Sequence, residues 1–125
     1  MLPAPHRMRR RTDFAETLRR GRRVGRGTLV VHLLRPMDEA SSTAGPLPAG
    51  QVGLVVSRAV GNSVVRHRVT RRLRAVIVPR LSALPQGTRL VVRALPAAAS
   101  ASSLQLATDL DAALDSAGRR RAVGA

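Results

Sequence analysis

The sequence contains no cysteine, lysine, tryptophan or tyrosine, and Phe14 is its one phenylalanine. The absence of cysteine excludes a disulfide framework, a cysteine-ligated zinc site and a thiol nucleophile. No apolar run approaches the ~20 residues that a membrane-spanning helix needs. No apolar segment follows the basic N-terminus, as a secretory signal would require. We therefore expect a cytoplasmic protein with no membrane partner.

Acidic residues are also scarce. The chain of 125 residues has 22 basic residues, all of them arginine, against 7 acidic ones, for a net charge of +15. Residues 40–108 hold nine of these arginines and no acid at all, so the excess charge is not confined to a tail. Such a charge is self-repulsive unless a polyanion neutralises it, and nucleic acid is the most common partner of this kind.

The hydrophobic pattern predicts one α/β domain over residues 12–117. A capping box at Asp13 and Glu16 indicates a short helix from there to about Arg20. Apolar periodicity and turn residues indicate helices over 63–78 and 102–117, strands over 28–34, 51–57 and 88–94, and a further short strand near 22–26. This order in a chain of single-domain size predicts a two-layer α/β sandwich. We expect a flexible basic N-terminus over residues 1–11, a flexible loop over 36–50 and a basic tail over 118–125.

The helix expected over residues 63–78 is amphipathic. At 100° per residue, its apolar positions form a stripe about 120° wide, enough to dock the helix on a sheet. These positions are Val65, Val69, Leu73, Val76 and Ile77. The opposite face carries His67, Arg68, Arg71, Arg72 and Arg74, while Arg66 falls within the apolar arc near the first turn. The preceding Gly61-Asn62 marks a turn, and either Asn62 or Ser63 can cap the helix.

The cations of this helix have no nearby acid in the sequence to balance them. A solvated helix face usually gains i,i+4 pairs of opposite charge, and cations in a first turn are disfavoured by the helix dipole. A phosphate backbone supplies the missing compensation, because a guanidinium grips phosphate with two parallel hydrogen bonds. We therefore favour a polyanion-binding face over a merely solvated one.

The run VGLVVSRAVGNSVVRHRVTRRLR, residues 52–74, resembles the protein component of bacterial ribonuclease P. That family has a VGxxVS strand, a basic residue, a Gly-Asn turn and a helix bearing R-N-R with further basic residues. The resemblance extends upstream to residues 9–14 and Arg20-Gly21, and downstream to residues 90–93, Pro96 and the closing helix. It covers roughly residues 7–117.

The resemblance implies a fold and a function. The fold would be a single α/β sandwich around a four-stranded sheet, with a left-handed crossover between parallel strands. The chain would be the accessory subunit of an endoribonuclease that removes the 5′ leader of precursor tRNA. Its partners would be ribonuclease P RNA and precursor tRNA, with no DNA partner. The RNA subunit, with Mg²⁺, would perform the hydrolysis, leaving the protein with no catalytic residue and no metal site of its own.

The resemblance also assigns site residues. Those implied to bind the RNA subunit are Arg58, Asn62, Arg66, His67, Arg68, Arg71, Arg72 and Arg74. Those implied to line a cleft for the single-stranded leader, between the first helix and the sheet, are Phe14, Leu18, His32 and Val55. His67 stands where the family has asparagine, and Leu18 and His32 stand where it has aromatics. Leader binding should therefore depend less on base stacking and more on charge. The alternative for Phe14 and His32 is plain core packing.

Protein-based chemistry has little support in the sequence. The histidines show no ligand spacing, and no Ser-His-Asp arrangement can be argued. Asp109, Asp111 and Asp115 are expected on the solvent side of the last helix. Two other classes of protein stay open. A small ribosomal protein would be equally basic, whereas a DNA-binding regulator is weakened because a strand, not a helix, precedes the arginine helix.

Overall fold

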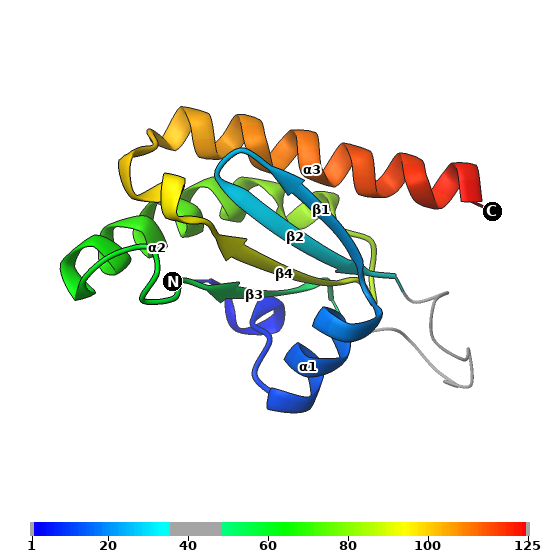
Figure 1. Cartoon of the computed structure of the whole chain (residues 1–125). Helices are drawn as coiled ribbons and strands as arrows, with labels where there is room; N and C mark the ends of the chain where they lie inside the picture. The colour runs from blue at the N-terminus through cyan, green and yellow to red at the C-terminus, as the bar shows by residue number, and fades with distance from the viewer. Residues whose placement is uncertain (1, 36–48, 125) are drawn as a thin grey trace.

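The computed structural model describes residues 2–35 and 49–124. Its main elements are α1 (Arg11–Arg20), β1 (Arg22–Arg26), β2 (Leu29–Leu34), β3 (Gln51–Val55), α2 (Ser63–Ile77), β4 (Arg89–Ala94) and α3 (Ser103–Gly124). Short 3₁₀ segments lie at Ala4–His6, Val78–Ala83 and Pro96–Ser100. Helix α1 lies on one face of the sheet, and α2 and α3 cover the other (Figure 1). The predicted α/β sandwich is confirmed.

The four strands form one mixed sheet in the order β1-β2-β4-β3. The β1–β2 and β2–β4 pairs are antiparallel, whereas β3 and β4 are parallel neighbours joined through α2. This connection is the parallel crossover that the resemblance implied. The short strand expected near residues 22–26 is present as β1, and β3 ends at Val55, two residues before its expected end.

Strand β2 packs against both helical layers, and all six of its residues are buried. Leu29, Val31 and Leu33 belong to the main core, together with Val69 and Leu73 of α2. The alternate positions face the side of α1, as the period-2 geometry of a strand requires. Both faces of this strand are therefore covered.

The first residues differ from the mobile segment expected over residues 1–11. Leu2 and Met8 are buried. The Met8 amide donates to the carbonyl of Val52 at 3.1 Å, and His6 Nδ1 lies 2.8 Å from the carbonyl oxygen of Gly50. The segment packs along the outer edge of β3, which offers unpaired backbone groups, and Leu2 and Met8 bury apolar surface there.

Two further predicted boundaries concern the end of α3 and the loop expected over residues 36–50. The backbone of α3 continues to Gly124, beyond the end expected at residue 117. Most of the loop expected over 36–50 falls on residues 36–48, outside the described part of the chain. Within the described residues, no helix is both long and apolar enough to cross a membrane.

Asp111 and Asp115 lie on the solvent side of α3, as the sequence predicted, whereas Asp109 is half-buried and contacts the β1–β2 turn. Asp109 Oδ2 accepts hydrogen bonds from the amide of Thr28 at 3.0 Å and from its hydroxyl at 2.6 Å. This fixes the β1–β2 turn, where Gly27 has a φ of +43° that favours glycine. Asp111 accepts two hydrogen bonds from Arg80, at 2.6 and 2.9 Å.

Candidate nucleic-acid interface

Helix α2 is docked and capped as its sequence predicts. Val69, Leu73, Val76 and Ile77 are buried against the sheet and α3. The Asn62 side chain accepts a hydrogen bond from the amide of Val65 at 3.0 Å and so caps the helix. Asn62, predicted to bind RNA, thus has a structural role that positions the arginines after it.

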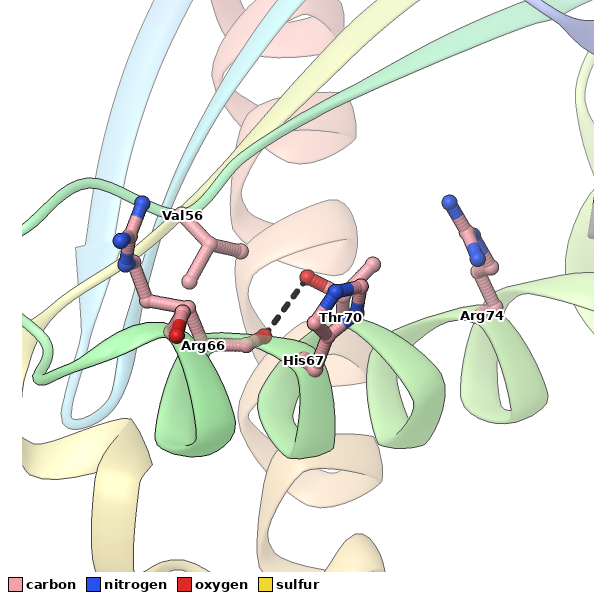
Figure 2. Close-up of a pocket in the computed structure, with 6 residues that line it drawn as sticks. Val56, Arg66, His67, Thr70 and Arg74 are labelled. Carbon is pink, nitrogen blue, oxygen red and sulfur yellow. Dashed lines mark hydrogen bonds between the residues drawn. The ribbon is translucent and has the colours of Figure 1, made fainter.

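One side of α2 forms a groove beside the end of β3. This β3-side groove has a volume of about 250 Å³ and is lined by Val56, Ser63, Arg66, His67, Thr70 and Arg74. Figure 2 shows Arg66 and Arg74 extending to the same side of the helix, with His67 and Thr70 between them. The Thr70 hydroxyl donates to the carbonyl of Arg66 at 2.8 Å. Arg66 Nε is buried and has no partner among the described residues.

The other side of α2 faces the chain that leads into α3. Arg72 Nη1 donates to the carbonyl of Ala101 at 2.7 Å, and Arg68 Nη2 lies 3.4 Å from that of Ala99. A hollow of about 330 Å³ opens here, lined by Arg68, Arg71, Arg72, Ala75 and Ser103; we call it the α2–α3 notch. Arg71 and Arg74 also share a third hollow, so the predicted RNA-binding arginines of α2 form one continuous band around the exposed part of the helix. Arg58 is exposed in the turn that follows β3.

The carboxylates of the described residues do not neutralise this helix. The ion pairs join Glu16 to Arg20, Asp111 to Arg80, and Arg89 to both Asp13 and Glu16. Over residues 2–35 and 49–124, no carboxylate pairs with an arginine of α2. The arginine face is thus an uncompensated cationic surface, as the sequence indicated.

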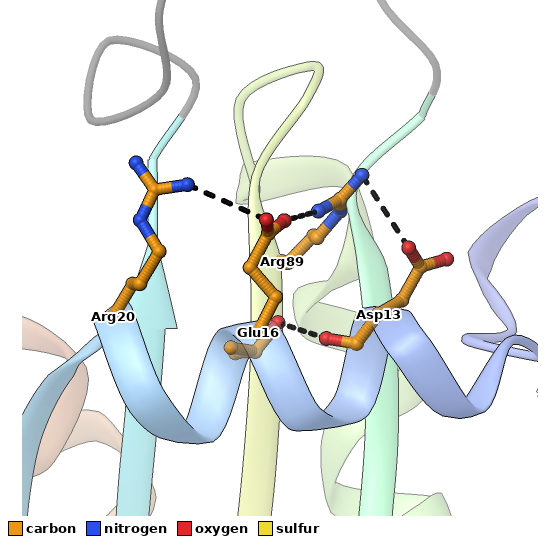
Figure 3. Close-up of polar contacts among 5 residues, drawn as sticks. Asp13, Glu16, Arg20 and Arg89 are labelled. Atoms are coloured by element: carbon orange, nitrogen blue, oxygen red, sulfur yellow. Dashed lines mark hydrogen bonds and ion pairs between the residues drawn. The ribbon is translucent and has the colours of Figure 1, made fainter.

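Helix α1 is anchored to the sheet by Arg89 of β4 (Figure 3). Arg89 Nη1 lies 2.5 Å from Glu16 Oε1, and Nη2 lies 3.6 Å from Asp13 Oδ1. Burial favours a higher pKa for the Glu16 carboxyl, but the hydrogen bonds and charges of Arg89 and Arg20 outweigh it and lower that pKa. Sequence reasoning missed this anchor, because 73 residues separate Glu16 from Arg89 and no local pattern links them.

Phe14 packs across β3 at Gly53. A Cβ atom added to Gly53 would lie 2.4 Å from two atoms of the Phe14 ring, so the ring occupies space that only glycine leaves open. Phe14 and Val55 are half-buried, and Leu18 is exposed. The side chain of Phe14 thus has both a packing role and a partly accessible surface, which combines the two interpretations that the sequence left open.

His32 lies under this surface and is only 4% exposed. It pairs in register with Arg23 of β1 and Val91 of β4. Neither ring nitrogen has a hydrogen-bond partner in the described part of the chain. Burial lowers the pKa of His32, and the positive charges of Arg93 and Arg23 lower it further. The burial agrees with the core-packing alternative, although the ring retains unused donor and acceptor capacity.

The buried, neutral imidazole predicts a pH-dependent stability. The unfolded chain takes up a proton at His32 below about pH 6.5, whereas the folded chain resists it, so the free energy of unfolding falls as pH drops from 7 to 5. His32→Leu should flatten this slope in urea titrations. The matched change at the exposed His67, to glutamine, should retain it; an unchanged slope in the His32 variant would contradict the assignment.

A small α/β sandwich whose crossover helix carries arginines without a carboxylate partner among the described residues has the features of a polyanion-binding protein. The chain belongs to the ribonuclease P protein family, because the family model described as Ribonuclease P matches residues 2–118. It is 54% identical over 114 residues to the ribonuclease P protein component of Streptomyces bikiniensis, covering 91% of this chain and 93% of that protein. It is 46% identical over 124 residues to that of Corynebacterium diphtheriae, covering 97% and 100% respectively.

Solved structures agree at the level of the fold. The RNase P protein of Staphylococcus aureus matches with a TM-score of 0.72 at 22% identity, covering 90% of this chain and 94% of that one. The RNase P protein of Thermotoga maritima matches with a TM-score of 0.64 at 19% identity, covering 83% and 90%. The mixed four-stranded sheet with its three helices is thus the architecture of this family.

Proposed function

We propose that this chain is the RNA-binding subunit of a bacterial ribonuclease P, which holds the catalytic RNA through α2 and the 5′ leader of precursor tRNA beside α1. The observation that carries the proposal is the arginine surface of α2, which has no carboxylate partner among the described residues. Docking of the opposite face fixes the helix backbone from which these arginines extend, so the helix itself needs no ordering when it meets phosphate.

The RNA subunit would be bound by Arg58, Arg66, His67, Arg68, Arg71, Arg72 and Arg74, with Asn62 fixing the start of the helix. Arg66 and Arg74 extend from one side of α2 and can grip neighbouring phosphates (Figure 2). The His67 imidazole, in the family's asparagine position, can donate or accept one hydrogen bond at each ring nitrogen.

The leader would lie on the sheet beside α1, against Phe14, Leu18 and Val55, with His32 beneath them. Arg23 and Arg93 are exposed on the same side of the sheet. Their charges can attract the leader's phosphates, which suits a surface with a single aromatic ring.

The proposal assigns no catalytic residue to the protein. Asp13, Glu16, Asp109 and Asp111 are engaged with arginines or with Thr28, so these carboxylates do not fit a magnesium site of the protein's own. Mg²⁺ would instead act with the RNA subunit and the substrate, whose phosphate oxygens suit a hard cation. The holoenzyme would work in the cytoplasm, where precursor tRNA is found.

A reconstitution assay tests this function. The purified protein is added to ribonuclease P RNA at low Mg²⁺, and release of the 5′ leader from precursor tRNA is followed. We expect strong stimulation by the protein. Absence of stimulation, together with tight binding to ribosomal RNA, would favour a small ribosomal protein instead.

Substitution of Gly53 tests the leader surface. Gly53→Ala should push the Phe14 ring off β3, since the added Cβ would overlap it at 2.4 Å. We expect the affinity of the holoenzyme for leader-bearing tRNA to fall about tenfold, the scale of one stacked base, while affinity for mature tRNA is unchanged. Phe14→Ala should have the same selective effect.

Gly25→Ala is the matched control, because its added Cβ would meet only a Val30 methyl at an ordinary 3.9 Å. It should leave both affinities unchanged. Equal losses for leader-bearing and mature tRNA in the Gly53 variant would count against a leader surface beside α1.

A further inference from the structure

Arg89 of β4 joins two carboxylates that lie about one turn apart on α1. Asp13 and Glu16 are three positions apart and so lie on the same face of the helix. Figure 3 shows the guanidinium of Arg89 between them. The three side chains are only 18–31% exposed, so water screens these ion pairs less than it screens pairs on the open surface. The contact therefore ties the first two turns of α1 to the start of β4.

The apolar packing of α1 is slight. Of the ten residues of this helix only Thr17 is buried, while Phe14 is half-buried and Leu18 is exposed. Helices in proteins are held mainly by the surface that they bury against their neighbours. A helix that buries so little can slide or tilt on a sheet unless polar contacts fix it. Arg89 supplies two such contacts.

The anchor lies close to the place where Phe14 packs. Gly53 stands opposite Val91 in the parallel β3–β4 pair, two residues along β4 from Arg89. Arg89 and Val91 therefore face the same side of the sheet, which is the side of α1. The backbone of Arg89 is about 7 Å along β4 from the residue paired with Gly53. The Phe14 ring fills the space over that glycine.

We propose that Arg89 is a positioning residue for the 5′ leader of precursor tRNA. It holds Asp13 and Glu16, and through the helical turn between them it fixes the Phe14 ring on β3. This inference rests on the proposed function, because the ring is the one aromatic contact that the protein offers to the leader. Arg89 itself would not contact the RNA, since its guanidinium is engaged with the two carboxylates.

A second effect of Arg89 has to be separated from positioning. Without its guanidinium, Asp13 and Glu16 would lose a counter-charge beside an anionic strand, and repulsion alone would weaken leader binding. Only the positioning role requires that the Phe14 ring itself moves. Because Phe14 is the single phenylalanine of the chain, that movement can be measured.

Biosynthetic labelling with para-fluorophenylalanine places one fluorine in the whole chain, on the ring of Phe14. The fluorine NMR resonance of the full-length protein then reports the surroundings of that ring. Arg89→Met removes the charge and every donor but keeps a long side chain. We expect this variant to shift the resonance toward that of a solvent-exposed ring. Gly53→Ala, which displaces the ring directly, should shift the resonance in the same direction.

Arg80→Met is the matched control. Arg80 forms the same kind of ion pair, with Asp111 of α3, and its side chain is 29% exposed against 24% for Arg89. Helix α3 covers the face of the sheet opposite α1 (Figure 1). Arg80→Met should therefore leave the fluorine resonance and the affinity for leader-bearing tRNA unchanged.

The functional readout compares two substrates. Each variant is assembled with ribonuclease P RNA, and the affinities of the holoenzyme for leader-bearing and mature tRNA are measured. Arg89→Met should weaken binding of leader-bearing tRNA about tenfold, the scale of one stacked base, and leave mature tRNA unaffected. The loss should persist when Asp13→Asn and Glu16→Gln are added to Arg89→Met, because the ring stays displaced. Recovery of the affinity would show that Arg89 only neutralises charge and would overturn the inference.

Glu16→Gln is a milder variant that keeps the test valid if Arg89→Met does not fold. It weakens the shorter of the two contacts and should shift the fluorine resonance in the same direction by a smaller amount. An unshifted resonance in the variants that fold, or equal losses of affinity for the two tRNAs, would contradict the positioning role.

The parent protein separates this inference from the proposed function. If its holoenzyme binds leader-bearing and mature tRNA equally, the leader surface beside α1 is wrong. If it prefers leader-bearing tRNA and Arg89→Met keeps that preference, only the role of Arg89 is refuted.

Discussion

Replacing Arg66 and Arg74 together with glutamine should lower the affinity for ribonuclease P RNA about 100-fold, since each charged hydrogen bond contributes ~1.5–3 kcal/mol. Both side chains line the β3-side groove and lack a carboxylate partner in the described structure. With ~6 phosphate contacts, the affinity of the parent protein should fall by ~10³ between 50 and 200 mM salt. The double variant should lose about one unit of log–log salt slope for each arginine. Filter binding across a salt series measures both quantities.

A matched double variant controls for the change in net charge. Arg9→Gln with Arg10→Gln removes the same two charges from exposed positions before and at the start of α1. It should bind RNA nearly as well as the parent protein and keep most of its salt slope. If the two double variants weaken binding equally, the helix has no special role and the protein binds RNA through its overall charge.

Replacing Asp109 with alanine should reduce the free energy of unfolding by about 2–3 kcal/mol, the range expected when a buried hydrogen-bonded group loses a charged partner. The carboxylate accepts both the amide and the hydroxyl of Thr28, which is 2% exposed. Without it, two buried donors at the β1–β2 turn lack their acceptor. Urea denaturation followed by circular dichroism measures the loss.

The neighbouring Asp111 provides the comparison. Asp111 accepts hydrogen bonds from Arg80, which lower the pKa of its carboxyl. Unlike Asp109, however, it lies in an exposed contact, because its side chain is 57% exposed. Water replaces such a partner, so Asp111→Ala should cost less than about 1 kcal/mol. Equal losses of unfolding free energy in the two variants would show that the burial of Thr28 does not increase the contribution of its carboxylate partner.

The elements of this fold could be predicted because their signals are local. The apolar stripe of α2, its Asn62 cap and the doubly buried β2 follow from residues within one helix or strand. The arginine surface was predictable for the same reason, since its lack of acidic neighbours is visible along the chain and holds in three dimensions for residues 2–35 and 49–124.

The contacts that could not be predicted join distant residues. Glu16 meets Arg89 and Thr28 meets Asp109 across 73 and 81 residues, and no periodicity marks either pair. The hollow between α2 and Ser103 also depends on where α3 begins, which the sequence of α2 alone cannot specify. The edge contact of the first residues was missed because basic composition concealed the two buried side chains, Leu2 and Met8.

The strand order has a consequence for synthesis on the ribosome. Strand β4 pairs with both β2 and β3, yet it is the last strand to be made, at residues 89–94. Until it emerges, the β1–β2 hairpin and β3 cannot be joined, and α2 has only part of the surface on which it packs. The growing chain therefore carries an arginine helix without its completed platform while it is still beside ribosomal RNA, and rapid closure by β4 would limit binding to the wrong polyanion.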